Sequence, residues 1–343
     1  MAVPSDPKRS PISLGFVAKA ALVVAGIICL VLTAVLLRNV ILLFFAAVVL
    51  AVIVDSGAML VRKVLPLRRK GSVTVACIVI ALILVGSGLL TGAQVSAQVS
   101  ALWQAVPQIT SLVQQRFDID LGAVLSNLVD ISWLSGALGY VPSVFGVVSA
   151  LILVVAGGIF LALDPEGYRE GLLLVVPPAH RDRIRVTVNE AASSLQRWLI
   201  GQMILMVVVG AATAAALALL GVPSALALGL IVGLLEFIPF VGPILGYVPL
   251  GLAALSQSFD TFWLVLAAYV LIQQLEGNAL APLIQKHTVE LPPVVALFSI
   301  VGLGLLFGPL GIILSVPLTV VLLVVLKNLY LEDVLHTSTA DRQ

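Results

Sequence analysis

The chain has 343 residues, of which 61% are hydrophobic and only 10% are charged, and its formal net charge is +1. Soluble domains are about half apolar and about one-quarter charged, so this composition excludes an ordinary soluble protein, as does a mean hydropathy of +1.19. The net charge gives no reason to expect a nucleic-acid partner. Apolar runs long enough to cross a bilayer recur along the chain. The sequence therefore predicts an all-α polytopic membrane protein in contact with membrane lipid.

Residues 1–90 are predicted to hold three membrane helices. The spans are residues 20–37, 40–60 and 72–90, and a tight turn at Arg38-Asn39 separates the first two. Asp55 in the second span is a secondary candidate for an intramembrane site, although an ion pair with Arg62 near the interface explains it better. The loop between the second and third spans contains five basic residues: Arg62, Lys63, Arg68, Arg69 and Lys70.

Positive charge predicts the orientation, because loops rich in Lys and Arg stay in the cytoplasm. Residues 91–140 carry a single basic residue, Arg116, and are predicted to form extracytoplasmic amphipathic helices. These helices either lie on the bundle and the lipid headgroups or form a contact between subunits of a homo-oligomer. Residues 141–163 are the fourth span, and residues 164–198 are a cytoplasmic amphipathic helical segment. The N-terminus and the tail at 327–343 are predicted to be cytoplasmic.

Residues 199–326 are predicted to be the transport core. After a fifth span, the apolar run 224–256 is broken by Pro239, Gly242 and Pro243. Proline removes a backbone donor and clashes with the preceding turn, so each half ends near the break and reaches only roughly 20 Å. The halves are too short to cross a bilayer, which predicts a re-entrant hairpin.

A second apolar run repeats this design, and a sixth span at 259–276 lies between the two. Residues 293–326 are broken at Gly308, Pro309 and Gly311. Paired, Gly/Pro-interrupted segments are the best sequence indication of a transporter's binding site. The fold is thus predicted to have about six full spans and two re-entrant helical hairpins. The alternative is that each broken run forms one long tilted helix, and the side on which residues 277–292 lie would decide between the two.

Glu236 is the one charged residue of the first broken run and lies a turn before its break. A charge at mid-bilayer costs about 2.5–3.5 kcal/mol, and a proton, a partner or water would lower that cost. Each is also a requirement of a proton- or cation-linked transport site. The structural alternative is a protonated glutamate that hydrogen-bonds the carbonyls freed at the break.

A second polar cluster closes the sixth span and supplies several oxygen acceptors. Helical spacing places Gln273 and Glu276 on one face, with Gln274 and Asn278 beside it. Together they could coordinate a cation or bind a polar solute. An interfacial helix end, where polar residues cost little, explains the cluster equally well.

Several of these segments together resemble the AI-2E family of bacterial transporters (autoinducer-2 exporter-like proteins). The matching stretches are Arg197-Trp-Leu-Ile-Gly-Gln202, Glu236-Phe-Ile-Pro-Phe-Val-Gly-Pro243, Gln273-Gln-Leu-Glu-Gly-Asn278 with Pro282, Leu291-Pro-Pro-Val-Val-Ala-Leu-Phe298, Phe307-Gly-Pro-Leu-Gly311 and Val316-Pro317. Pro292-Pro293 departs from a His-Pro that is frequent in the family. The resemblance implies an inner-membrane transporter, and the family's substrates include a quorum-sensing furanone and, for some members, sodium or other cations exchanged for protons.

The predicted function is therefore a secondary transporter, either an exporter or a cation/proton-coupled carrier, in the bacterial inner membrane. Its substrate would be a small polar solute or a monovalent cation such as Na⁺, exchanged with H⁺. No HExxH, P-loop, CxxC or Gly-x-Ser-x-Gly pattern occurs, so no enzymatic activity, cofactor or metal site is predicted. The alternatives are a channel-like protein and a non-transporting oligomeric membrane scaffold.

Overall fold

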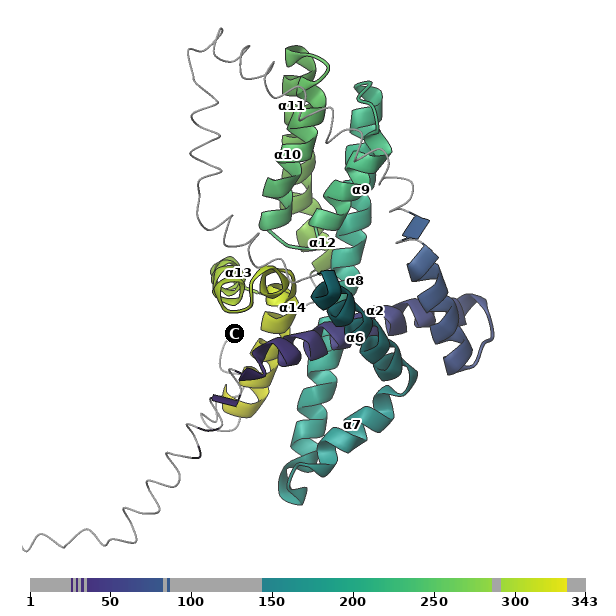
Figure 1. Cartoon of the computed structure of the whole chain (residues 1–343), viewed down its shortest axis with the longest axis vertical. Coiled ribbons are helices and arrows are strands. Elements are labelled where there is room, and N and C mark those ends of the chain that lie inside the picture. The colour runs from purple at the N-terminus through teal and green to yellow at the C-terminus, as the bar shows by residue number, and fades with distance from the viewer. Residues whose placement is uncertain are drawn as a thin grey trace, which may run out of the picture. The chain divides into compact units, whose positions relative to one another are not determined.

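A computed structural model describes residues 36–82, 85–86, 144–285 and 291–331, together with positions 26, 29, 32 and 33. All regular elements in these ranges are helices, as the sequence predicts (Figure 1). The predicted outer helices at 91–140, most of the first span and the end of the tail lie outside the described residues. The chain divides into two compact units, residues 1–42 and 43–343, and the site lies entirely in the second.

In the first unit, the predicted tight turn at Arg38-Asn39 is wrong. Both residues belong to helix α2 (Arg38–Val64), which begins there. The amide of Leu37 donates to the carbonyl of Thr33 at 2.9 Å, and the amide of Ile41 donates to that of Leu37 at 2.9 Å. This four-residue spacing is helical. Arginine favours helix and asparagine tolerates it, so this polar pair without Gly or Pro does not end a helix.

The second unit begins with the rest of α2, which packs against the helical residues 69–82 and against α6 (Val144–Leu163). Asp55 lies here. Its Oδ1 is 2.8 Å from Arg69 Nη2 and 4.0 Å from Arg62 Nη2, so the expected ion pair forms chiefly with Arg69. The same Arg69 nitrogen donates to the carbonyl of Ala162 at 3.2 Å, which ties α6 to the pair.

Helix α6 ends at a sharp bend before α7 (Pro165–Leu174), and the two axes differ by 92°. Asp164 caps α7, because its side chain accepts a hydrogen bond from the Gly167 amide at 3.0 Å. Pro165 occupies the first turn, where its missing amide hydrogen costs nothing. This is the ordinary helix boundary that the Asp-Pro-Glu sequence indicates.

A single helix of 39 residues, α8 (Arg181–Leu219), carries both the predicted cytoplasmic segment and the fifth span. At 1.5 Å per residue it is about 58 Å long, roughly twice the hydrocarbon thickness of a bilayer. Helix α9 (Ala225–Leu235) packs along it in the antiparallel direction. A Cβ on Gly229 would lie 2.5 Å from the Gly210 carbonyl, and one on Gly233 would lie 2.6 Å from the Met206 carbonyl. Only glycine permits this close approach of two backbones.

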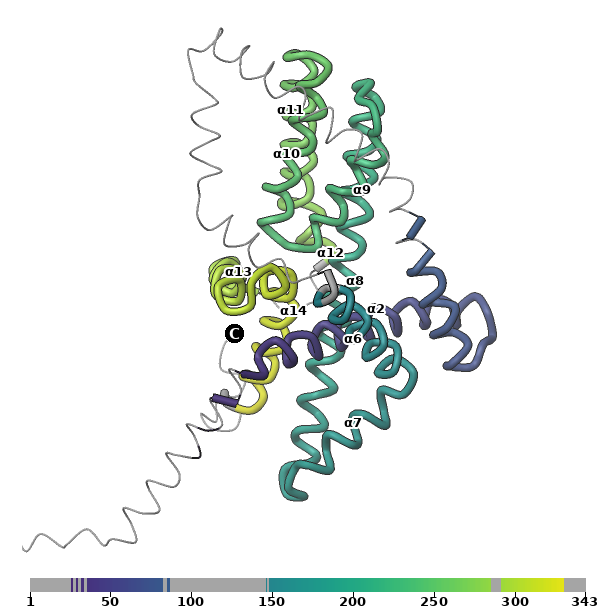
Figure 2. The backbone as a smooth tube through the Cα atoms, viewed as in Figure 1, coloured from purple at the N-terminus to yellow at the C-terminus, as the bar shows by residue number. Residues whose placement is uncertain are grey.

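The first broken run forms two short antiparallel helices, α9 and α10 (Val241–Leu255), as Figure 2 shows. A Cβ on Gly242 would collide with the carbonyl of Leu235, and one on Gly246 would lie 3.5 Å from Val232. Residue 242 thus faces residue 235, and residue 246 faces residue 232, so the two helices run in opposite directions and the chain reverses at the break. Helix α11 (Phe259–Leu275) then packs on α10 and leads into a π-helical turn (Glu276–Leu280) and the short α12 (Ala281–Gln285).

The second broken run also reverses, between α13 (Pro293–Phe307) and α14 (Pro309–Leu326). A Cβ on Gly304 would touch the side chain of Ile312 at 2.8 Å, so the two arms pack closely beside the turn. Helix α14 begins at Pro309, inside the predicted break, because proline is well suited to a first helical position. A second π-helical turn (Lys327–Leu331) follows it.

Four helices in the described ranges are long and apolar enough to cross a membrane, or five if the bent pair α6 and α7 counts as one span. They include α2, α8, α11 with its extension, and α14. Helices α9, α10 and α13 are apolar but shorter. The first broken run is therefore made of two short helices, whereas one arm of the second is long enough to span by itself.

Candidate functional site

Glu236 ends α9 at the break and is only 3% exposed. The backbone around it keeps part of its hydrogen bonding, because the amide of Ile238 donates to the carbonyl of Leu235 at 3.0 Å. Phe240 then adopts a positive φ of 65°, which turns the chain into α10. A carboxyl group is thus buried at the point where the helix cannot continue.

Pro239, Gly242 and Pro243 build this break. Proline at 239 has no amide hydrogen to donate to the previous turn. The amide of Gly242 donates to the carbonyl of Ile238 at 2.8 Å, and its lack of a side chain allows contact with the carbonyl of Leu235. The three residues determine the turn, while Glu236 provides the titratable group.

Gln202 of α8 contacts the break directly, although the site predicted from the sequence does not include it. Its Nε2 donates to the main-chain carbonyl of Glu236 at 2.5 Å, and the residue is 2% exposed. The signal that could have found it is the single glutamine in the apolar part of α8 that follows Arg197, since buried polar side chains require partners.

Tyr269 of α11 holds the other side of the break and is also absent from the predicted site. Its hydroxyl donates to the carbonyl of Pro243 at 3.1 Å, and its ring packs edge-on against Tyr247, with the ring centroids 4.6 Å apart. The hydroxyl fits because residue 246 is glycine, at which any Cβ would clash with it. Two side chains from different helices therefore fix the carbonyls that flank the break.

The polar cluster at the end of α11 and in the turn after it divides between two faces. Gln273 Nε2 lies 3.5 Å from Glu236 Oε2, a long hydrogen bond, and Glu276 interacts electrostatically with Glu236. Gln274 and Asn278 are exposed and bond to each other, with Asn278 Nδ2 donating to Gln274 Oε1 at 2.8 Å. The structure brings Gln273 and Glu276 to Glu236 and directs the other two residues elsewhere.

The remaining predicted site residues lie apart from this group. Gly308 has a φ of +68° and reverses the chain between α13 and α14, while Pro309 starts α14 and Gly311 packs against the carbonyl of Leu303. Asp55 belongs to the ion-pair cluster of α2. In the described ranges, no three His, Cys, Asp or Glu residues form a group that could hold a metal ion.

Comparison with known proteins identifies the family. Residues 21–331 match the family described as AI-2E family transporter. This chain belongs to the AI-2E family. One relative, named "Putative transport protein YrrI" of Bacillus subtilis (strain 168), is 30% identical over 167 residues, which cover 49% of this chain and 47% of the relative. Another, the AI-2 transport protein TqsA of Escherichia coli (strain K12), is 32% identical over 142 residues, which cover 41% of each chain.

The family assignment and the apolar helices together make this AI-2E protein a multi-pass membrane protein of a transporter family, as the resemblance of its motifs implies. The chain spans about half the length of the curated relatives that it matches. What those relatives transport therefore enters only as a proposal for this chain.

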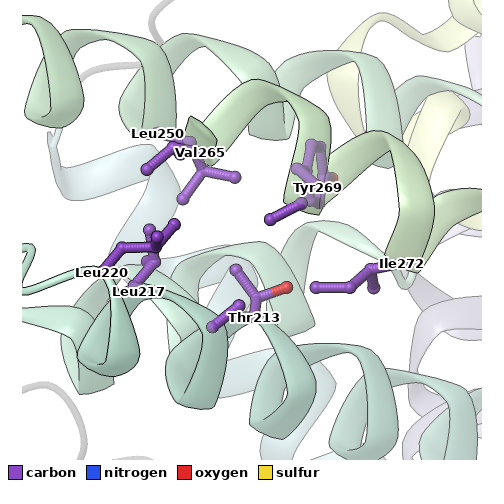
Figure 3. Close-up of a pocket in the computed structure, with 9 residues that line it drawn as sticks. Thr213, Leu217, Leu220, Leu250, Val265, Tyr269 and Ile272 are labelled. Atoms are coloured by element: carbon purple, nitrogen blue, oxygen red, sulfur yellow. The ribbon is translucent and has the colours of Figure 1, made fainter. Parts of the chain in front are cut away.

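A small pocket in this AI-2E protein lies between α8, α10 and α11, and Tyr269 belongs both to its lining and to the group around Glu236 (Figure 3). The lining is almost entirely apolar, with the ring of Tyr269 on one side and Thr213 on the other. Thr213 Oγ1 is buried without a hydrogen-bond partner among the described residues. Buried water requires two or more polar partners, so a pocket with one unpaired hydroxyl does not suit water or a polar solute. The candidate site for a polar solute or a cation is therefore the group around Glu236 and not this pocket.

Proposed function

We propose that this protein is a secondary transporter of the bacterial inner membrane that carries a small polar solute or a monovalent cation. Glu236 would be the group whose protonation is linked to transport. The observation that supports the proposal is the burial of this carboxyl at a helix break, next to Gln273 and Glu276. The carboxyl is 3% exposed, so a charge there must be compensated by a bound cation, a proton or local rearrangement.

The neighbouring carboxyl strengthens this argument. Two carboxylates that interact repel each other when both are ionised, and a proton or a cation removes that repulsion. The side-chain amide of Gln273, on α11, has both a donor and an acceptor, so it can hydrogen-bond Glu236 in its protonated or its ionised form. Competition between a proton and a cation for one site is the simplest basis for exchange.

The broken runs provide the backbone chemistry that such a site requires. Non-helical backbone at membrane depth is tolerated only where protein or a water-filled cavity satisfies its polar groups. Gln202 and Tyr269 satisfy two carbonyls at the first break. On this ground we propose that the first broken run is a re-entrant hairpin, and we extend the proposal to the second because its chain also reverses, at Gly308. We further propose that both termini are cytoplasmic and that the protein forms a homo-oligomer.

The central experiment measures flux in proteoliposomes with an imposed pH gradient, using Na⁺ and candidate polar solutes. Glu236→Gln keeps the size and the hydrogen bonding of a neutral acid but cannot titrate. We expect coupled flux to fall at least about tenfold, because the exchangeable proton is lost, which corresponds to about 1.4 kcal/mol of coupling. Glu166→Gln, an exposed change in the first turn of α7, is the matched control.

A Glu236→Gln variant with wild-type flux across the whole pH range would assign Glu236 to structure alone. Flux that continues but neither saturates nor responds to the pH gradient would instead favour the channel-like alternative. Absence of any flux with every candidate solute and cation would favour the scaffold.

A separate experiment tests the hairpin topology. With re-entrant hairpins, residues 277–292 face the cytoplasm. A cysteine at Gln285 is expected to react with an impermeant thiol reagent only after cells are permeabilised. Reaction from outside intact cells would favour two long tilted helices instead.

A further inference from the structure

The main-chain carbonyl of Glu236 lacks its usual partner because of the break. In a continuous helix it would accept a hydrogen bond from the amide four residues later, at Phe240. Phe240 instead has a positive φ of 65° and begins the turn into α10. A buried carbonyl without a donor is costly, so this group needs a donor from outside its own segment.

Gln202 supplies that donor from a different helix. The Nε2–O distance is 2.5 Å, and the two residues are 34 positions apart in the sequence. Gln202 is 2% exposed and Glu236 is 3% exposed, so bulk water cannot replace the bond without movement of the break.

We propose that Gln202 is a positioning residue that fixes the peptide unit at the break and thereby directs the Glu236 carboxyl toward Gln273. This inference rests on the proposed role of Glu236. The carbonyl carbon and the side chain are both bonded to Cα of Glu236, so a shift of the backbone at this residue also moves the carboxyl. Because Gln202 bonds to the backbone of Glu236, it acts on the carboxyl through the main chain.

Helix α8 is well suited to this role because other contacts hold it in place on both sides of Gln202. The glycine contacts of Gly210 and Gly229 fix α9 against it beyond Gln202. Toward its N-terminus, Arg183 donates to the carbonyl of Asn328 at 2.6 Å, and Asn328 donates to Glu190 Oε2 at 2.6 Å. A donor on a helix held at both ends is a rigid reference for the break.

The test measures the reactivity of Glu236 itself, so it does not depend on knowing the substrate. The probe is dicyclohexylcarbodiimide, which modifies protonated carboxyl groups in apolar surroundings, with modification at Glu236 followed by mass spectrometry over a range of pH. Gln202→Leu removes the donor at similar size. We expect modification to become about tenfold faster, the change that corresponds to loss of one buried hydrogen bond worth about 1.4 kcal/mol.

A second variant separates positioning from general destabilisation. In Gln202→Glu, the introduced carboxyl can donate to the Glu236 carbonyl only when it is protonated. The reactivity of Glu236 should resemble wild type at acidic pH and be at least as fast as in Gln202→Leu at alkaline pH, where the new carboxylate also repels the charged form of Glu236. Tyr269 on α11 and Glu276 in the following turn also interact electrostatically with Glu236. Both residues are left unchanged in every variant.

The matched control is Gln257→Leu. Gln257 Nε2 also donates to a main-chain carbonyl, that of Gly221 at 3.3 Å, but it is exposed and lies at the opposite end of α10. This change should leave the reactivity of Glu236 as in wild type.

Three results would overturn the proposal: equal acceleration by Gln202→Leu and Gln257→Leu, no acceleration or no reaction in Gln202→Leu, or a Gln202→Glu variant that follows Gln202→Leu at every pH. Failure of the proposed transport role gives a different result, since Glu236→Gln would keep wild-type flux while Gln202→Leu still altered the modification of Glu236.

Discussion

The two broken hairpins both contain Gly and Pro at their breaks, but the side chains around the two breaks differ. The break between α9 and α10 contains a buried carboxyl, and Gln202 and Tyr269 hold its flanking carbonyls. The break between α13 and α14 consists of Gly308 and Pro309 and has no titratable group at the turn. Gly/Pro breaks therefore specify a reversal of the chain, while the surrounding helices decide whether the reversal becomes a polar site.

The hairpins also differ in how they pack. Helix α9 lies against α8 with glycine at each close contact, whereas a Cβ added to Gly302 in α13 would meet no neighbouring atom within 4 Å. Helix α13 exposes large apolar side chains such as Phe298 and Leu305, while its partner α14 packs on α8. The first hairpin is thus held in the protein by both of its arms and the second mainly by one.

The largest difference between the hairpins should appear when a methyl group is added to each. Gly229→Ala places a Cβ 2.5 Å from the Gly210 carbonyl, and neither backbone can yield easily. We expect a loss of stability of about 3 kcal/mol or more, as in severe overpacking. Thermal unfolding in detergent micelles measures this, with Gly302→Ala as the control.

Gly302→Ala should leave the unfolding temperature unchanged or raise it slightly, because alanine is favoured over glycine in a helix interior by about 0.5–1 kcal/mol. Equal losses in the two variants would show that the packing of the hairpins does not differ in the way described.

The second comparison concerns the backbone at the two breaks. Gly308 has a φ of +68° and a ψ of −150°, a region that residues with a side chain avoid. Gly308→Ala should cost about 1–3 kcal/mol through strain alone. Phe240 adopts a φ of +65° despite its side chain, so Phe240→Gly should relieve strain of about 1 kcal/mol at the first break.

Unfolding temperatures of these two variants measure the difference. Gly308→Ala should lower the unfolding temperature. Phe240→Gly should have a higher unfolding temperature than Phe240→Ala, because both variants lack the phenyl ring and only glycine relieves the backbone strain. A Phe240→Gly variant less stable than Phe240→Ala would contradict strain at the first break.

The smallest effect is expected at the π-helical turns that follow α11 and α14. Asn328 is 7% exposed, and its side chain donates to Glu190 Oε2 at 2.6 Å, so Asn328→Ala, which removes this bond and keeps the carbonyl that accepts from Arg183, should cost about 1 kcal/mol. Asn278 is exposed and bonds within its own turn to Gln274. Asn278→Ala should change stability by less than about 0.5 kcal/mol, and equal effects in unfolding measurements would remove this distinction.

Several features were predictable from the sequence because they depend on local properties of the chain. Apolar runs predicted the helices, Pro239 and Gly308 predicted the breaks, and the isolated charge at Glu236 drew attention to the first of them. The Arg38-Asn39 turn was predicted wrongly for the same reason, since a local polar pair was given more weight than continuous helical hydrogen bonding. The resemblance in the motifs from 197 to 317 indicated the family, which the match over residues 21–331 shows.

The sequence by itself thus determined a helical membrane protein with two chain reversals and a carboxyl at one of them. Only the tertiary structure decided that Gln202 and Tyr269 contact that reversal, because residues 34 and 26 positions away are brought to it by helix packing. It also turned Gln273 toward Glu236 while Gln274 bonds with Asn278 on an exposed face. Hydrogen-bond partners depend on distance in space, and spacing along one helix specifies only which residues share its face.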